Sequence, residues 1–193
     1  MAYLDEKLKD RIDEYAIQLI IIKQDKPDDN NDSIYKIFER INTAGTKLLP
    51  QEIRASSYHG KFNELLSELA NKQEWINFIQ MSNTRKSHEE LILRFLALYF
   101  DLENYKSPMK HFLNVYMNKN RNFKYNSKQD IENIFEKTIE ICSHFIKKED
   151  ICLKGSNRVN TQLLDSILVG IAKNIDNPAL MNNGYTKDII RII

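Results

Sequence analysis

The sequence predicts a mainly α protein, with about eight helices in an irregular bundle and one short β-strand near residues 17–23. Three observations support this fold class. Apolar residues recur every three or four positions along most of the chain. Helix-capping residues precede several of these periodic segments. The 193 residues include only five glycines and four prolines, so long flexible linkers are not expected. We expect one unit over residues 1–60 and a helical domain over 61–193.

The first unit begins with a short amphipathic helix, predicted by the fourfold spacing of Leu4, Leu8 and Ile12. The segment AIQLIIIK (16–23) is nearly all apolar and β-branched, which favours a strand buried on both faces. The sequence offers no second strand to pair with it. This strand is therefore an orphan that needs a sheet from elsewhere.

Residues 32–60 predict two helices joined by a turn. Asp32 or Ser33 can cap the first helix, whose apolar face is Ile34, Ile37, Phe38 and Ile41. Gly45 suits a left-handed position in the turn after that helix. Pro50 suits the first position of the second helix, since a proline there loses no helical hydrogen bond.

Periodic apolar residues predict further helices that include residues 62–69, 75–79, 87–100, 112–116, 131–146 and 163–171, with a short segment after Thr186. Their starts carry recognisable caps. Ser87 and Glu90 form the pattern of a capping box, as do Ser127 and Asp130. Asn160 or Thr161 can cap the helix that begins near residue 161.

Composition excludes several functional classes. The net charge of +1 excludes a strongly basic nucleic-acid binder as a description of the whole chain. Cys142 and Cys152 are the only cysteines, which disfavours both a disulfide framework and a thiolate zinc site. No apolar run approaches the roughly 18 residues of a membrane span. We therefore expect a cytoplasmic protein without membrane contact.

Motifs for catalysis or cofactor binding are not found in this sequence. Its four histidines, His59, His88, His111 and His144, show no metal-ligand spacing. No glycine-rich phosphate loop and no nucleophile elbow occurs either. The sequence thus predicts no metal site, no cofactor and no catalytic residue within this chain.

Two polar segments are candidate contacts for nucleic acid or an anion. Residues 117–128 interleave cations with aromatic rings, a pattern that suits single-stranded nucleic acid, although a solvated loop shows it as well. The members are Lys119, Arg121, Phe123, Lys124, Tyr125 and Lys128. Arg158 and Asn160 precede a predicted helix and could hold an anion there, or Asn160 could simply cap that helix.

The stretch IFERINTAGTKLLPQEIRAS (37–56) carries a family resemblance. It is similar to the pattern iFerlNtgGtpLtpqEiRna, a signature of the domain of unknown function 262 family, which includes the ParB/sulfiredoxin-like N-terminal domain of GmrSD-type restriction systems. The matching residues are Phe38, Glu39, Arg40, Asn42, Thr43, Gly45, Thr46, Leu48, Gln51, Glu52, Ile53 and Arg54. Weaker resemblance extends over most of the chain.

The family's other signature, Asp-Gly-Gln-Gln-Arg, does not occur in this sequence. In the family this signature precedes the matched region and, together with the Phe-x-x-x-Asn element (Phe38 to Asn42 here), is implied in nucleotide hydrolysis or DNA cleavage. The resemblance therefore implies that residues 1–60 are the tail of a ParB/sulfiredoxin-like domain whose N-terminal part lies outside this sequence. That domain would be a partner of this chain, and nucleotide or Mg²⁺ would belong to the longer protein. Leu49 also departs from the family, which carries Ser or Thr there, and so removes a capping hydroxyl.

Carried over by residue, the resemblance makes Arg40, Asn42 and Glu39 candidates for a nucleotide or DNA pocket. Arg40 could hold a phosphate, or pair with Glu39 or Glu52. Asn42 could position a base, a ribose or a neighbouring loop, or could simply end its helix. Phe38, Leu48 and Ile53 are expected in the core, and Gly45, Glu52 and Arg54 are expected to support the turn.

These observations lead to two hypotheses of different kinds. The first is a helical part of a restriction or phage-defence protein, which contributes Arg40 and Asn42 to a shared site and is inactive alone; the whole protein would be a nuclease or NTPase. The alternative is a helical module that binds a protein partner or a second copy and contacts neither nucleotide nor DNA. Binding of DNA through residues 117–128 is a third possibility.

Overall fold

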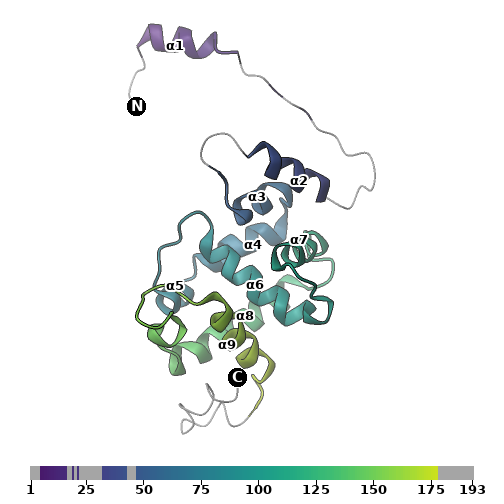
Figure 1. Cartoon of the computed structure of the whole chain (residues 1–193), viewed down its shortest axis with the longest axis vertical. Helices are drawn as coiled ribbons and strands as arrows, with labels where there is room; N and C mark the ends of the chain where they lie inside the picture. The colour runs from purple at the N-terminus through teal and green to yellow at the C-terminus, as the bar shows by residue number, and fades with distance from the viewer. Residues whose placement is uncertain (1–4, 17–18, 20, 22–31, 43–46, 178–193) are drawn as a thin grey trace.

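The computed structural model describes residues 5–16, 19, 21, 32–42 and 47–177. Their helices confirm the mainly α fold class (Figure 1). In chain order the elements are α1 (Glu6–Asp13), α2 (Asp32–Ile41), α3 (Pro50–Ser57), α4 (Lys61–Ala70), α5 (Gln73–Ile79), α6 (Ser87–Asp101), the 3₁₀ turn η1 (Leu102–Asn104), α7 (Met109–Lys119), α8 (Lys128–Phe145), the 3₁₀ turn η2 (Lys148–Ile151) and α9 (Thr161–Lys173).

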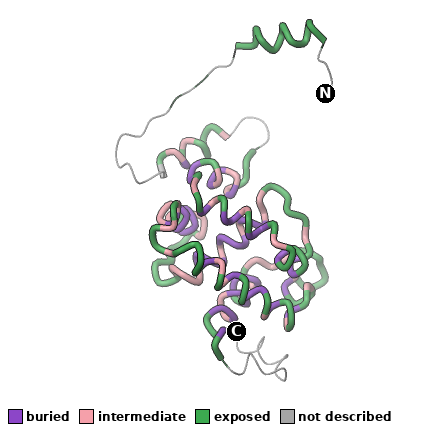
Figure 2. Tube along the Cα trace, turned by 180° about the vertical axis from the view of Figure 1, so that it is seen from behind, coloured by how far each residue is buried: buried purple, intermediate pink, exposed green. Residues whose placement is uncertain are grey.

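Helix α6 forms the centre of the body. Its residues Ile92, Leu93, Phe95 and Leu96 are fully buried, because α4, α7 and α9 pack around it. Helix α8 closes the other side by packing against α5 and α9. Figure 2 shows the buried residues concentrated along these inner helices. No helix of the described residues is both long and apolar enough to cross a bilayer.

Helix α1 stands apart from the rest of the described chain (Figures 1 and 2). None of its residues is buried, and Leu8 and Ile12 are 50% and 57% exposed. The predicted strand near residues 17–23 lies mostly outside the described residues. The two that are described, Leu19 and Ile21, are irregular and about three-quarters exposed. Within the described part the only bridge between extended residues joins Cys152 and Val159.

Of the four helix caps that the sequence predicts, those at Ser127 and Asn160 are confirmed, whereas α2 already begins at Asp32, one of the two residues expected to precede it. The Asp130 amide donates to the Ser127 hydroxyl at 3.1 Å, and the Leu163 amide donates to the Asn160 side-chain oxygen at 3.3 Å. The capping box at Ser87 is wrong. Helix α6 begins at Ser87 itself, and the side-chain oxygen of Asn83 accepts the His88 amide instead, at 3.1 Å.

The predicted core positions Phe38 and Leu48 are also wrong. Phe38 is 43% exposed and Leu48 is 41% exposed, whereas Ile53 is buried as expected. Helix α2 rests on the body along one edge through Tyr35, whose ring stacks on Tyr58 with centroids 6.2 Å apart. The apolar stripe beside Tyr35 therefore lies largely uncovered. Tyr35, Ile53 and Tyr58 belong to the same hydrophobic core as residues 61–177.

Candidate functional site

The motif residues build a two-helix corner at one end of the body. We use the name corner for α2, α3 and the described residues between them, 42 and 47–49. Helix α3 packs against α2 on one side and against α6 and α7 on the other (Figure 1). Gly45 and the other residues of 43–46 lie outside the described residues. The geometry of the corner therefore depends on the side chains that flank this turn.

Asn42 closes the turn with its side-chain amide. Its Nδ2 donates to the Leu48 carbonyl at 3.0 Å, and its Oδ1 accepts the Leu48 amide at 2.7 Å. Both functional ends of the carboxamide are thus used on one backbone residue. Of the roles that the sequence left open, the structure places Asn42 on the neighbouring loop.

Glu52 and Arg85 hold the start of α3. The Arg85 guanidinium donates to both Glu52 carboxylate oxygens, at 3.2 and 2.7 Å, and also to the Lys47 carbonyl. Glu52 in turn accepts the Leu49 amide at 2.6 Å, which replaces the capping hydroxyl that Leu49 cannot offer. These hydrogen bonds from Arg85 and Leu49 lower the pKa of Glu52.

Arg85 reaches Glu52 from an unusual backbone conformation. Arg85 and its neighbour Lys86 have φ angles of +54° and +62°, in the left-handed region that side chains other than glycine rarely adopt. Such a conformation costs of order 1 kcal/mol or more per residue and persists where the surrounding structure holds it. The left-handed backbone just before α6 therefore places the Arg85 side chain next to Glu52 of the corner.

Arg54 lies fully buried beneath the corner. Its Nε donates to Gln51 at 2.7 Å, and its Nη1 lies 3.5 Å from the Asn114 side-chain oxygen. The Glu90 carboxylate, 3.4 Å from Nη2, provides the opposite charge. Burial lowers the pKa of Arg54, and Glu90 opposes that effect. This motif arginine joins α3 to α6 and α7 and is closed to ligands.

Arg40 and Glu39, adjacent on α2, differ in their contacts. Glu39 forms an ion pair with Lys110 of α7, and the Lys110 ammonium lies 5.5 Å from the centroid of the Tyr35 ring. Arg40 is exposed and forms no ion pair with any described residue. Neither Glu39 nor Glu52 pairs with Arg40, because Lys110 and Arg85 occupy them.

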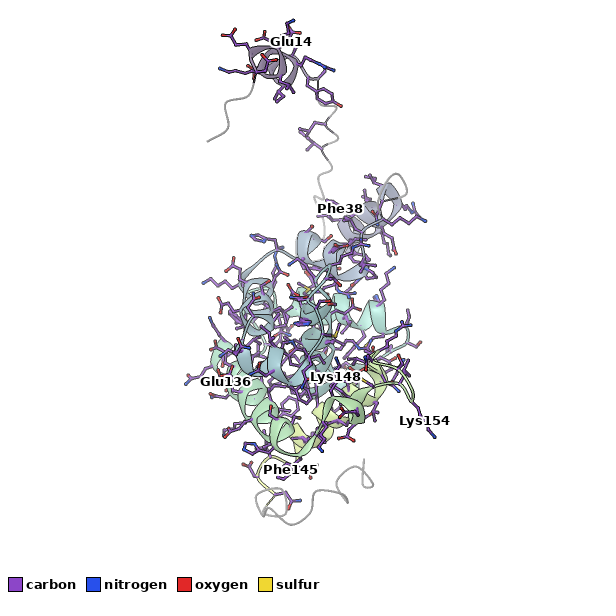
Figure 3. The ribbon with its side chains drawn as sticks, turned by 90° about the vertical axis from the view of Figure 1, so that its left-hand side faces the viewer. Glu14, Phe38, Glu136, Phe145, Lys148 and Lys154 are labelled. Carbon is purple, nitrogen blue, oxygen red and sulfur yellow. The ribbon has the colours of Figure 1, made fainter. Side chains whose placement is uncertain are left out.

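An apolar surface lies next to Arg40. We define the corner surface as Phe38, Ile41, Leu48 and Leu49, which are exposed by 43%, 58%, 41% and 41%. Figure 3 shows Phe38 at the end of the body, far from Lys154. Hydrogen bonds from Asn42, Glu52 and Arg85 fix the backbone of 47–49, so Leu48 and Leu49 are held in their exposed positions.

Residues 117–128 do not form a continuous unpaired basic surface. Lys119 lies 3.4 Å from Asp101, and Lys128 lies 2.8 Å from Glu68. Phe123 packs edge-on against Phe62 in the core, with ring centroids 6.4 Å apart. Lys124 and Tyr125 are exposed, with the ammonium 6.0 Å from the ring.

Arg121 ties this segment to the body. Its Nε donates to the His59 carbonyl at 2.6 Å. Its chain also runs across Gly60, where an added Cβ would lie 2.8 Å from both Arg121 Cγ and the Arg121 carbonyl. Three of the four cations are therefore engaged with the protein itself.

Arg158 and Asn160 do not form a shared site, because they have different contacts. Asn160 caps α9 through its side-chain oxygen, as the simpler of the two interpretations expected. Arg158 is exposed in the loop before it, and its backbone carbonyl accepts the Leu153 amide at 2.8 Å. Within the described residues, no group of three or more His, Cys, Asp or Glu side chains could hold a metal ion.

The sequence missed four residues that shape the corner: Tyr35, Arg85, Lys110 and Asn114. Arg85, Lys110 and Asn114 contact residues that are 33 to 71 positions away in the sequence. No local sequence pattern predicts contacts over such separations. Tyr35 sits next to the isoleucine stripe that drew attention to α2. Compared with known proteins, the chain matches no protein-family model, no curated protein and no solved structure.

Proposed function

We propose that this chain is a helical component of a restriction or phage-defence protein of the type that the motif resembles, and that its corner forms one wall of a nucleotide- or DNA-handling site. A second domain, the ParB/sulfiredoxin-like part of such proteins, supplies the rest. The observation that carries the proposal is Arg40: it is exposed and unpaired among the described residues, while both neighbouring acids are engaged elsewhere.

The roles within this site divide between two motif residues. Arg40 offers a guanidinium, which suits phosphate oxygens in a two-point contact. Asn42 acts as a positioning residue, since both ends of its side chain hold the Leu48 backbone. The contact from this chain is therefore to the charged phosphate rather than to a base.

The phosphate contact of Arg40 is tested by measuring how tightly the chain binds a fluorescent single-stranded oligonucleotide and ATP at low salt. Arg40→Ala should weaken binding about tenfold and reduce its salt dependence by about one phosphate contact. Arg40→Lys should restore part of the affinity, since it keeps the charge. Lys154→Ala, which removes an exposed cation far from the corner, is the control.

The same samples test for catalysis. With the chain alone we expect no hydrolysis of ATP, GTP, or modified or unmodified DNA above the level of Arg40→Ala. If the wild-type chain hydrolyses one of these substrates and Arg40→Ala does not, the result would contradict the proposal that a second domain supplies the rest of the site. Equal binding by wild type and Arg40→Ala would remove Arg40 from the site.

The corner surface supports the alternative function, a module that binds a protein. Hydrogen bonds hold the backbone of residues 47–49, so Leu48 and Leu49 lose little backbone freedom on binding, which favours a protein partner. Ile41→Asp and Arg40→Ala separate the two functions in cells that carry the whole defence system. If only Ile41→Asp abolishes phage resistance, the result favours the protein-binding module. If Arg40→Ala abolishes phage resistance, the result shows that the contact between Arg40 and an anion is needed for function.

A further inference from the structure

The proposed function does not explain two exposed apolar surfaces on this chain. One is the corner surface, and the other is the stripe of Leu8, Ile12 and Tyr15 along and just beyond α1, exposed by 50%, 57% and 75%. The remaining large exposed apolar residues that are described after residue 50 are Ile76, Tyr125, Leu153 and the pair Leu102 and Tyr105 at η1. Neither of these two apolar surfaces is covered by a described residue.

Helix α1 needs a partner to persist. It has eight residues, and isolated helices shorter than about 12–15 residues are marginal in water. It finds none on its own body, because no residue of α1 is buried. Figure 3 shows Glu14, at the end of α1, well separated from Phe38.

The two surfaces are complementary in charge as well as in apolarity. Residues 5–14 carry five acidic and three basic side chains, a net charge of −2. In the corner as a whole the exposed cations Lys36, Arg40 and Lys47 form no ion pair with a described residue, whereas the acids Glu39 and Glu52 are already paired. The charge that remains open in the corner is positive. An amphipathic helix with acidic neighbours matches it.

We propose that α1 of one chain docks on the corner surface of a second copy, and that the second copy returns the same contact, which makes a two-fold dimer by exchange of α1. The 18 residues 14–31 that join α1 to α2 can span up to about 60 Å, enough to reach a neighbouring body. One short helix buries less than the roughly 1,200 Å² of a stable interface, so two reciprocal contacts should make a much tighter dimer than a single contact. This dimer goes beyond the proposed function and competes with it for the corner surface.

The experiment is complementation between two variants of the full chain, measured by sedimentation over a range of protein concentrations. Leu8→Asp disables α1, and Ile41→Asp disables the corner surface. Each variant alone should have a dimer dissociation constant at least about tenfold weaker than wild type. An equimolar mixture should form a heterodimer that is weaker than the wild-type dimer but tighter than either variant alone, because one of the two contacts then joins an intact α1 to an intact corner surface. Leu153→Asp, an exposed leucine elsewhere, is the control and should dimerise like wild type.

The other outcomes overturn the exchange. A monomer whose α1 amides are protected from hydrogen exchange would show that α1 docks on its own corner, and a monomer with unprotected α1 would show that it docks nowhere. A dimer that Ile41→Asp breaks and Leu8→Asp does not would be a contact between two corners. None of these variants changes Arg40, so the failure of the exchange can be told apart from the failure of the proposed function, which is tested by Arg40→Ala.

Discussion

Asn42 shows how one side chain can have a structural role inside a motif that resembles a functional one. The motif gives three candidates for the pocket, and Arg40 and Asn42 are the two that the resemblance favours most. The structure separates them, because the Asn42 carboxamide holds the amide and carbonyl of Leu48 while Arg40 faces solvent. Sequence spacing cannot make this distinction, since it depends on where the chain returns six residues later.

Hydrogen exchange at Leu48 tests this role. In Asn42→Ala the Leu48 amide loses its acceptor and should exchange faster, and the free energy of unfolding should fall by about 1 kcal/mol. Asn42→Asp keeps an oxygen for the Leu48 amide and loses the donor to the Leu48 carbonyl, so it should preserve the protection of that amide. Unchanged exchange in Asn42→Ala would assign the turn to other contacts.

At the scale of elements, the caps show what the sequence can and cannot predict. Ser127 and Asn160 were predicted correctly, because a cap is a contact between residues three apart. Ser87 failed because Asn83, four residues earlier, supplies the oxygen from an irregular segment. Helix α2 was predicted as a helix, but its periodicity marks an apolar side without saying whether anything covers it. Tyr35, beside that stripe, makes the contact with the body.

The attachment of α3 should depend on pH through Glu52. The pKa of Glu52 lies below its ordinary value of 4.5, because Arg85 and the Leu49 amide stabilise the carboxylate. A carboxyl with a lowered folded-state pKa adds stability above its unfolded pKa, and this stability is lost as the pH falls through the folded pKa. The stability difference between wild type and Glu52→Gln should therefore be largest near neutral pH and vanish in acid. Glu64→Gln, an exposed substitution on α4, controls for general charge effects.

A difference for Glu52→Gln that stays constant from neutral pH into acid would contradict this account. It would mean that the Glu52 side chain acts by its shape rather than by its charge. Urea unfolding at a series of pH values makes the measurement.

At the scale of the whole molecule, one buried ion pair joins the two most strongly packed helices. Arg94 of α6 and Asp165 of α9 are 13% and 10% exposed, and Arg94 Nε lies 3.2 and 3.1 Å from the two carboxylate oxygens. Burial raises the pKa of Asp165, although Arg94 opposes the shift. In the sequence Arg94 is the only charged residue of the apolar run 91–100, and nothing local reveals that its partner is 71 residues away.

Removing one member of this pair should cost more than removing both. Arg94→Ala leaves a buried carboxylate without its counter-ion, which costs about 3–5 kcal/mol. The double variant Arg94→Met with Asp165→Leu leaves no buried charge and should be markedly more stable than Arg94→Ala. Urea unfolding monitored by circular dichroism compares them, and a double variant less stable than Arg94→Ala would contradict the argument.

Gly60 has a consequence for how this chain can vary. The side chain and carbonyl of Arg121 lie where the first atom of any other side chain would stand. Any larger residue at position 60 must move Arg121 from the His59 carbonyl. In a library of random variants, position 60 would therefore tolerate few replacements, and those few would have to shift the backbone around Arg121, because its carbonyl is part of the clash. The residue type that is possible at position 60 therefore depends on the placement of Arg121, which is far away in the sequence.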